Sequence, residues 1–342
     1  MNDSKTIHIS TNTILRVILI ILFLVFLYLI RDVIVIFLFA LIIASAIAPA
    51  VNLLEKIKIP RIIGALLIYI IVIGLLGFLI SLIVPSIARD IKDLSSNLPE
   101  YVEGFSAKFE ALKNASTKYQ DIVNRVQSSL TGIGELLKKS ASNLFSTAVN
   151  IFGGMFSFMI ALVISFYLSV QKKGVQHVLI SIIPYNHRDY AIDLWERSQR
   201  KLGRWLQGQL FLGIVIGVLV YVGLYFLDVR FALLLAVLAG ILEIFPYIGP
   251  VLAAIPAIIL GFLQAPILGL WVLILYIVIQ QLENYLIVPL VIGKIVKLNP
   301  VAVILALLIG GRLGGIPGMI LAVPIAAVVA EFFRDLIKKR KQ

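Results

Sequence analysis

The chain has 342 residues, of which 61% are hydrophobic and 14% charged, and its mean hydropathy is +1.04. A composition this apolar excludes a soluble globular domain and predicts an all-α polytopic membrane protein. There is no cysteine, which excludes disulfides, thiolate chemistry and cysteine-based metal sites.

Eight apolar segments are long enough to cross a hydrocarbon core of about 30 Å. They cover residues 14–30, 33–54, 62–84, 149–170, 210–227, 231–262, 267–292 and 301–333. The first follows Lys5 and Arg16, as the apolar part of a signal peptide would, but no small-residue cleavage site follows it. We therefore expect an uncleaved helix within an N-terminal unit of three membrane helices, residues 1–84, with residues 149–170 as the fourth span.

Positive charge predicts the orientation of these segments. The loop 171–204 carries Lys172, Lys173, Arg188, Arg197, Arg200, Lys201 and Arg204, and the tail 334–342 carries Lys338, Lys339, Arg340 and Lys341. By the positive-inside rule both are cytoplasmic, and the four spans before the loop place the N-terminus inside as well. The net charge of +12 thus mostly reflects membrane topology. Because the cations flank membrane segments, no nucleic-acid partner is expected.

Residues 85–148 form the one substantial polar insert, which follows the third span and should be extracytoplasmic. Two apolar stripes at heptad spacing predict amphipathic helices there. The stripes are Ile87, Ile91, Leu94, Leu98, Val102, Phe105, Phe109 and Leu112, then Ile122, Val126, Leu130, Ile133 and Leu137. The run Ser95-Ser96-Asn97 before Pro99 resembles a helix start, which favours two helices in the first stripe. The insert either packs on itself or on the membrane surface, or forms an oligomerisation collar.

Residues 232–257 and 301–326 form a near-repeat inside the apolar segments 231–262 and 301–333. Each copy runs into a break of glycine and proline that also holds an ionisable residue, Glu243 in the first and Arg312 in the second. Each segment is either a tilted or broken full span or a re-entrant hairpin, and two hairpins would meet as inverted elements near the midplane. The residues expected to shape the breaks are Pro246, Gly249 and Pro250, then Gly310, Gly311, Gly314, Gly315, Pro317 and Pro324.

Polar side chains within this C-terminal transport core, residues 205–333, are the candidates for binding. A glutamate at bilayer depth costs about 2.5–3.5 kcal/mol, so Glu243 is expected to face a cavity, a partner or a proton path, or to make an interhelical hydrogen bond. Arg312 could pair with an acid, bind substrate or extend to the membrane interface. A polar wall between the two copies suits a neutral solute or a coupling ion, although amides also join membrane helices. The wall consists of Gln280, Gln281, Glu283 and Asn284.

Several motifs together resemble the AI-2E family of bacterial transporters, the autoinducer-2 exporter family. They are Glu243-x-x-Pro246-Tyr247-Ile248-Gly249-Pro250, Gln281-x-Glu283-Asn284 before Pro289, Leu298-Asn299-Pro300, the glycine-rich stretch 310–318, Leu321-Ala322-Val323-Pro324, and Trp205-Leu206-x-Gly208-Gln209. The resemblance implies a homo-oligomeric, pentameric transporter of the inner membrane. Some members are described as exporters of autoinducer-2 and others as sodium(lithium)/proton antiporters.

Taken together, these features predict a secondary transporter that exports a small polar solute of the autoinducer-2 type by alternating access, coupled to H⁺ or Na⁺. A Na⁺(Li⁺)/H⁺ antiporter is the alternative, followed by a passive channel and a non-transporting envelope scaffold. An enzyme is not expected, because His8, His177 and His187 lie outside the predicted spans and no HExxH, GxSxG or Walker pattern is present. We expect no cofactor and no metal site. The expected partners are the bilayer, the solute or cation, and further copies of the chain.

Overall fold

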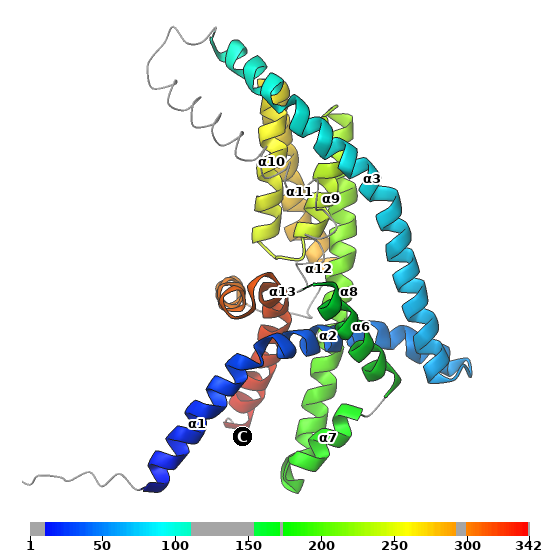
Figure 1. The fold of residues 1–342 in the computed structure, drawn as a ribbon, viewed down its shortest axis with the longest axis vertical. Coiled ribbons are helices and arrows are strands. Elements are labelled where there is room, and N and C mark those ends of the chain that lie inside the picture. Colours follow the sequence, from blue (N-terminus) through cyan, green and yellow to red (C-terminus); the bar gives the residue numbers. More distant parts are fainter. Residues whose placement is uncertain (1–10, 111–153, 172–173, 292–298, 341–342) are drawn as a thin grey trace, which may run out of the picture.

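A computed structural model describes residues 11–110, 154–171, 174–291 and 299–340. Every regular element in these ranges is helical (Figure 1). The second apolar stripe of the insert, Ile122 to Leu137, lies outside the described residues. The predicted all-α architecture is thus confirmed.

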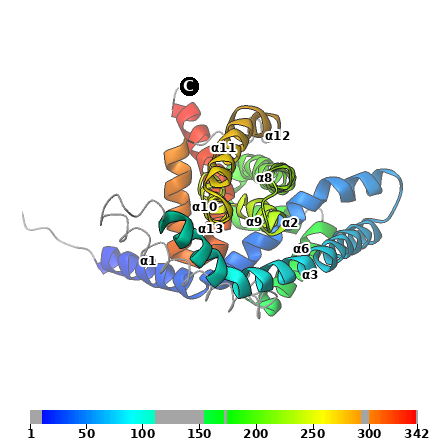
Figure 2. The same ribbon diagram turned by 90° about the horizontal axis from the view of Figure 1, so that it is seen from above.

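The N-terminal helices differ in how they are packed. Helix α1, Thr11–Leu29, projects from the body and keeps its apolar side chains exposed (Figures 1 and 2). Helix α2, Arg31–Lys56, instead buries Ala40, Leu41 and Ile42 against later helices. An apolar helix that the rest of the described chain leaves uncovered requires lipid or another protein surface around it.

Helix α3, Arg61–Glu110, carries the third span directly into the polar insert. Its 50 residues extend about 75 Å at about 1.5 Å per residue, which exceeds the thickness of a bilayer. The helix boundary predicted at Ser95-Ser96-Asn97 is wrong, because α3 passes Pro99 without ending. The apolar stripe keeps its phase through this point in the sequence, and Leu94, just before it, is buried against α9 and α10. Tertiary contact therefore outweighs the local start signal.

The basic segment 171–204 is largely helical rather than an irregular loop. It contains α7, Gly174–Ile182, the short 3₁₀ helix η2, Tyr185–His187, and the first half of α8, Arg188–Phe226. Helix α6, Met155–Val170, precedes it. Because α8 is continuous, the charged segment is connected rigidly to the fifth predicted span, which begins at residue 210.

The first broken segment folds as two short antiparallel helices, α9, Ala232–Leu242, and α10, Ile248–Gln264, which we call the first hairpin (Figure 1). Small and branched side chains close it, with Leu235, Ala236 and Ala239 of α9 in one buried cluster with Ala253 and Ala257 of α10. Helix α11, Pro266–Leu282, then leads into the π-helix η3, Glu283–Ile287, and α12, Val288–Val291.

The second broken segment lies in α13, Pro300–Arg340, which also folds back on itself. The backbone leaves helical geometry at Gly314 and at Gly315, where φ is 60° and ψ is −144°. A Cβ atom on Gly310 would collide with the carbonyl oxygen of Gly318 and lie 2.9 Å from Ala322 Cβ. Residues eight apart in a straight helix are separated by about 12 Å. We call this element the second hairpin, with a first arm before Gly314 and a second arm after Gly315. The second arm continues as helix to Arg340, so most of the predicted tail 334–342 is part of it.

The eight predicted apolar segments allow eight membrane crossings if both broken segments span the bilayer, or six crossings if both are re-entrant hairpins. Six helices in the described part of the chain are long and apolar enough to cross a membrane, or seven if α6 and α7 form one bent span. Helix α13 is counted among the six because its whole length is considered, although it folds back at Gly314 and Gly315. The first hairpin is not among them, because its helices have 11 and 17 residues, fewer than the about 20 that a span needs.

Candidate functional site

Both hairpins border one small polar cavity of about 120 Å³, which we call the acid cavity. Four parts of the chain line it: α8, the break of the first hairpin, the segment from η3 to α12, and both arms of the second hairpin. The lining residues are Trp205, Gln209, Leu212, Glu243, Pro246, Tyr247, Glu283, Asn284, Val288, Val303 and Val323. None of these residues carries a positive charge, so two glutamates dominate the electrostatics of the cavity.

The first break places Glu243 at the C-terminal end of α9. Pro246 lacks a backbone N–H, and Tyr247 takes a positive φ of 68°, so the helix cannot continue past this point. Gly249 then approaches the Leu242 carbonyl so closely that a Cβ atom would collide with it. This tight turn holds the Glu243 side chain inside the protein, 2% exposed, and no side-chain or backbone group in the described part of the chain donates a hydrogen bond to its Oε2 atom.

Glu283 approaches the same cavity from α11. It is the first residue of the π-helix η3, and such wide turns often occur at functional sites because they redirect side chains. Its side chain is 6% exposed and in hydrogen-bonding contact with that of Glu243. Gln280 Nε2 donates to Glu283 Oε2 at 3.1 Å. Two ionised carboxylates this close in apolar surroundings repel each other strongly, so the arrangement suits a shared proton or a bound cation.

The structure brings together some of the predicted site residues and separates others. Glu243, Glu283 and Asn284 line the acid cavity, and Gln280 contacts it through Glu283. Gln281 is exposed and is not among the lining residues. Arg312 is also exposed, on the first arm of the second hairpin, and does not line the cavity.

Three residues of α8, Trp205, Gln209 and Leu212, also line the acid cavity, and sequence analysis assigned none of them a role. Gln209 is 4% exposed and donates from Nε2 to the backbone carbonyl of Glu243, while its Oε1 atom is buried without a partner. Trp205 is buried beside it. The available signal was an amide inside an apolar run, in the motif Trp205-Leu206-x-Gly208-Gln209, whose neighbours across the fold cannot be read from sequence.

Comparison with known proteins gives this site its context. Residues 17–338 match the profile described as AI-2E family transporter. The chain belongs to this family. It is 34% identical over 300 residues to a Bacillus subtilis (strain 168) protein named "Putative transport protein YueF", covering 85% of this chain and 80% of that protein. A transport protein of Haemophilus influenzae, named in the same manner, is 27% identical over 340 residues, covering 95% of this chain and 92% of that protein.

The predicted resemblance is therefore confirmed. Membership in the AI-2E family and the apolar helices make the chain an integral membrane protein, and transport is the function that the relatives' names support. This family assignment also favours a role other than catalysis.

Among the remaining break residues, some pack closely against the opposite arm and others have non-helical backbone angles. Gly310 packs on Gly318, which closes the two arms, whereas Gly314 and Gly315 form the turn itself. Other predicted break residues lie near these turns: Pro250 is in the first turns of α10, Gly311 is in the first arm, and Pro317 and Pro324 are in the second arm. Hinge motion at these positions stays a prediction.

An ion-pair network joins the N-terminal half of α8 to the second arm of the second hairpin. Arg197 contacts Glu331 at 2.9 Å and Asp335 at 2.7 Å, and Lys201 also pairs with Glu331. Asp193 binds the same guanidinium at 2.9 Å. The start of α8 and the end of α13 lie near the end of the molecule that holds the C-terminus (Figure 1). Segments predicted as a loop and a tail are thus connected electrostatically.

Proposed function

We propose that this AI-2E family protein is a secondary transporter that exports a small polar solute of the autoinducer-2 type by alternating access, with a coupling proton carried by Glu243 and Glu283. The observation that supports it most is the acid cavity, where two buried carboxyl groups meet between two hairpins. Transport by rearrangement of broken helices around a central site requires this kind of placement.

The hydrogen bonds suggest how the pair divides its proton. Gln280 donates to Glu283, which stabilises the charged form of that side chain. Glu243 has an Oε2 atom with no donor, so we assign it the proton, which it can share with Glu283. Asn284 and Gln209 supply amide groups to the same space and would hold the solute by hydrogen bonds. Release of the proton would leave two repelling charges, which favours a change of conformation or capture of a cation.

The two hairpins offer the moving parts of the cycle. In the proposed topology both termini are cytoplasmic in the inner membrane, and the hairpins enter the bilayer from opposite sides to meet at the acid cavity. The network from Arg197 and Lys201 to Glu331 would close the cytoplasmic side in the described conformation and open when the second arm moves. The exposed apolar faces of α1 and α3 suit a homo-oligomer in lipid, and a pentamer is the number that the family resemblance implies.

A Na⁺(Li⁺)/H⁺ antiporter is the second candidate. It is favoured by the composition of the acid cavity, because two carboxyl groups and amide oxygens without a basic side chain among the lining residues are typical ligands for a small cation. A volume of about 120 Å³ also accommodates an ion with part of its hydration.

Purified protein in proteoliposomes distinguishes the two candidates. One set of vesicles would follow labelled autoinducer-2 under an imposed pH gradient, and a second would follow internal pH under a sodium or lithium gradient. We expect saturable autoinducer-2 flux that requires the pH gradient and is lost in Glu243→Gln/Glu283→Gln. Asp32→Asn, which alters an exposed acid on α2, is the matched control and should transport normally.

The other outcomes are equally informative. Cation-driven pH change without autoinducer-2 flux would replace the first proposal with the antiporter. Flux that is saturable but unaffected by the double variant would disprove the role of the acid pair. If correctly inserted protein gave neither autoinducer-2 flux nor a change of internal pH, the proposal of a transporter would be contradicted and a scaffold role favoured.

A further inference from the structure

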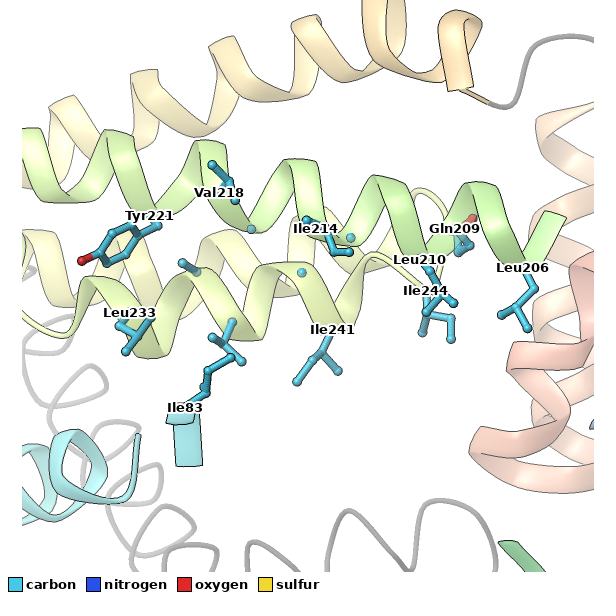
Figure 3. Close-up of a pocket in the computed structure, with 15 residues that line it drawn as sticks. Ile83, Leu206, Gln209, Leu210, Ile214, Val218, Tyr221, Leu233, Ile241 and Ile244 are labelled. Atoms are coloured by element: carbon cyan, nitrogen blue, oxygen red, sulfur yellow. The ribbon is translucent and has the colours of Figure 1, made fainter. Parts of the chain in front are cut away.

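A second cavity, larger and almost entirely apolar, lies along the outside of the same helices. Its volume is about 530 Å³, within the range of about 300–1,000 Å³ typical of small-molecule sites. We call it the lateral groove, and it runs between α8 and α9 with Ile83 of α3 opposite (Figure 3). Ile214 and Val218 form one wall, and Leu233 and Ile241 form the other.

The floor of the lateral groove is made of glycine. A Cβ atom on Gly213 would lie 2.6 Å from the Gly240 carbonyl oxygen, and one on Gly240 would lie 2.7 Å from the Gly213 carbonyl oxygen. Gly217 continues the same face of α8. The two backbones are therefore in contact, and the space above them is left unfilled by side chains.

The shape of the lateral groove fits an extended chain. It reaches along α8 from Leu206 to Tyr221, and those fifteen residue steps correspond to about 22 Å. Helices α3 and α8 expose large apolar side chains along this stretch, so the surroundings of the groove are hydrocarbon. A molecule dissolved in the bilayer could enter sideways with its apolar part along the glycines.

One end of the lateral groove is polar and adjoins the acid cavity. Gln209 lines both spaces, and Figure 3 places it with Leu206 and Ile244 at the end opposite Tyr221. The buried Gln209 Oε1 atom has no donor, and neither does Glu243 Oε2 in the adjoining cavity. An unpaired amide oxygen at the groove's end, next to a cavity that holds a pair of acids, favours a ligand group that donates hydrogen bonds and carries a positive charge.

We propose that the lateral groove binds membrane-dissolved amphiphiles with an amine head, which lies at Gln209 while the alkyl chain extends past Gly213 and Gly217. This inference rests on the proposed function, since it makes the groove a lateral route for such amines to the Glu243–Glu283 pair. Charge complementarity selects an amine over a fatty acid, because a carboxylate head would lie beside the unpaired Gln209 Oε1 atom and the Glu243–Glu283 acids, while Gln209 Nε2 already donates to the Glu243 carbonyl.

Photolabelling of the full chain in phosphatidylcholine nanodiscs tests this site directly. The probe is dodecylamine carrying a diazirine within its alkyl chain, and crosslinks are mapped by peptide mass spectrometry. We expect labels within residues 206–221 and 233–244 that unlabelled dodecylamine displaces. A dodecanoate probe should label about tenfold more weakly, the change expected when one buried hydrogen bond is lost.

Variants separate groove binding from general partition into lipid. Gln209→Leu should weaken labelling by about tenfold. Val218→Trp should abolish labelling, because the larger side chain fills the groove. Ile274→Trp, on the exposed face of α11, is the control and should be labelled as strongly as the unaltered protein. Equal labelling by the two probes, or unchanged labelling in both Gln209→Leu and Val218→Trp, would overturn the proposal. Crosslinks joining two copies of the chain through these residues would also overturn it, by showing that a second copy occupies the groove.

The outcome is independent of solute transport. Labelling requires no flux, so proteoliposomes that fail to move autoinducer-2 would disprove the proposed function and leave amine binding standing. Normal solute flux with no labelling of the lateral groove would disprove amine binding and leave the proposed function standing.

Discussion

The two hairpins have similar sequences and similar shapes but different chemical surroundings. In the first, the break directs Glu243 inward, where Gln209 of α8 and Glu283 of η3 meet it. In the second, Arg312 lies exposed beside the Gly314–Gly315 turn. The second hairpin contributes only apolar Val303 and Val323 to the acid cavity. A repeated pattern of glycine and proline therefore sets the path of the backbone, while the elements packed opposite determine which copy carries the polar site.

The largest effect is expected where the hairpins are most tightly closed. Gly249→Ala would place a Cβ atom against the Leu242 carbonyl, and Gly310→Ala would place one against the Gly318 carbonyl. Each backbone must shift, so we expect each variant to lose about 3 kcal/mol of unfolding free energy, measured by thermal unfolding in detergent. Gly74→Ala on α3, with nothing within 4 Å, is the control and should not be destabilised. If Gly249→Ala is as stable as Gly74→Ala, the first hairpin does not close as described.

A smaller effect is expected from the ion pairs that hold the second hairpin to α8. Glu331→Gln removes the carboxylate that Arg197 and Lys201 share, and Glu331 is 14% exposed. Charged hydrogen bonds of this kind contribute about 1.5–3 kcal/mol, so we expect a loss of about 2 kcal/mol that shrinks in high salt. Asp32→Asn, which alters an exposed pair, should change little. A salt-independent loss would contradict an electrostatic role.

Backbone strain gives the next prediction. Gly315 has a positive φ of 60°, but no neighbouring atom lies within 4 Å of the position that an alanine Cβ would take, so the cost of Gly315→Ala is conformational only. We expect a loss of about 1–2 kcal/mol, clearly less than for Gly310→Ala in the same hairpin. Thermal unfolding of the two variants side by side measures the difference. Equal losses would mean that strain, rather than close approach of the arms, governs the second hairpin.

The smallest effect is expected at the ionisable residue of the second break. Arg312→Gln removes an exposed charge that does not line the acid cavity, so its unfolding free energy should stay within about 0.5 kcal/mol of the unaltered protein. The same thermal assay measures it. A large loss would show that Arg312 makes an essential contact and that the two breaks are chemically more alike than their surroundings indicate.

Much of the fold could be predicted from sequence because apolar length and Gly/Pro breaks act locally. Composition predicts membrane helices, and the near-repeat predicts two interrupted segments. The local start signal at Ser95-Ser96-Asn97 failed because α3 is held by distant contacts, including Leu94 against the first hairpin and the Asp90 carboxylate, which accepts from the Leu234 backbone N–H. Such contacts depend on where other helices lie.

The candidate site was predictable in part for the same reason. Glu243 and Glu283 stand out as acids in apolar segments, but their meeting depends on the hairpin turn and on the π-helix that rotates Glu283 inward. Gln281 precedes the π-helix and lies about 200° around the helix from Glu283, so it stays outside the cavity, although the prediction placed it in the polar wall. Gln209 lies 34 residues from Glu243, and no local pattern connects the two.

The central claim is that Glu243, in the break of the first hairpin, couples solute transport to the ion gradient, and that Arg312, in the break of the second hairpin, does not. The most direct test compares Glu243→Gln with Arg312→Gln in proteoliposomes, following autoinducer-2 flux under a pH gradient and internal pH under a sodium gradient. We expect Glu243→Gln to lose ion-coupled flux while Arg312→Gln keeps it. Retained coupling in Glu243→Gln, or loss in Arg312→Gln with an unchanged fold, would contradict the account.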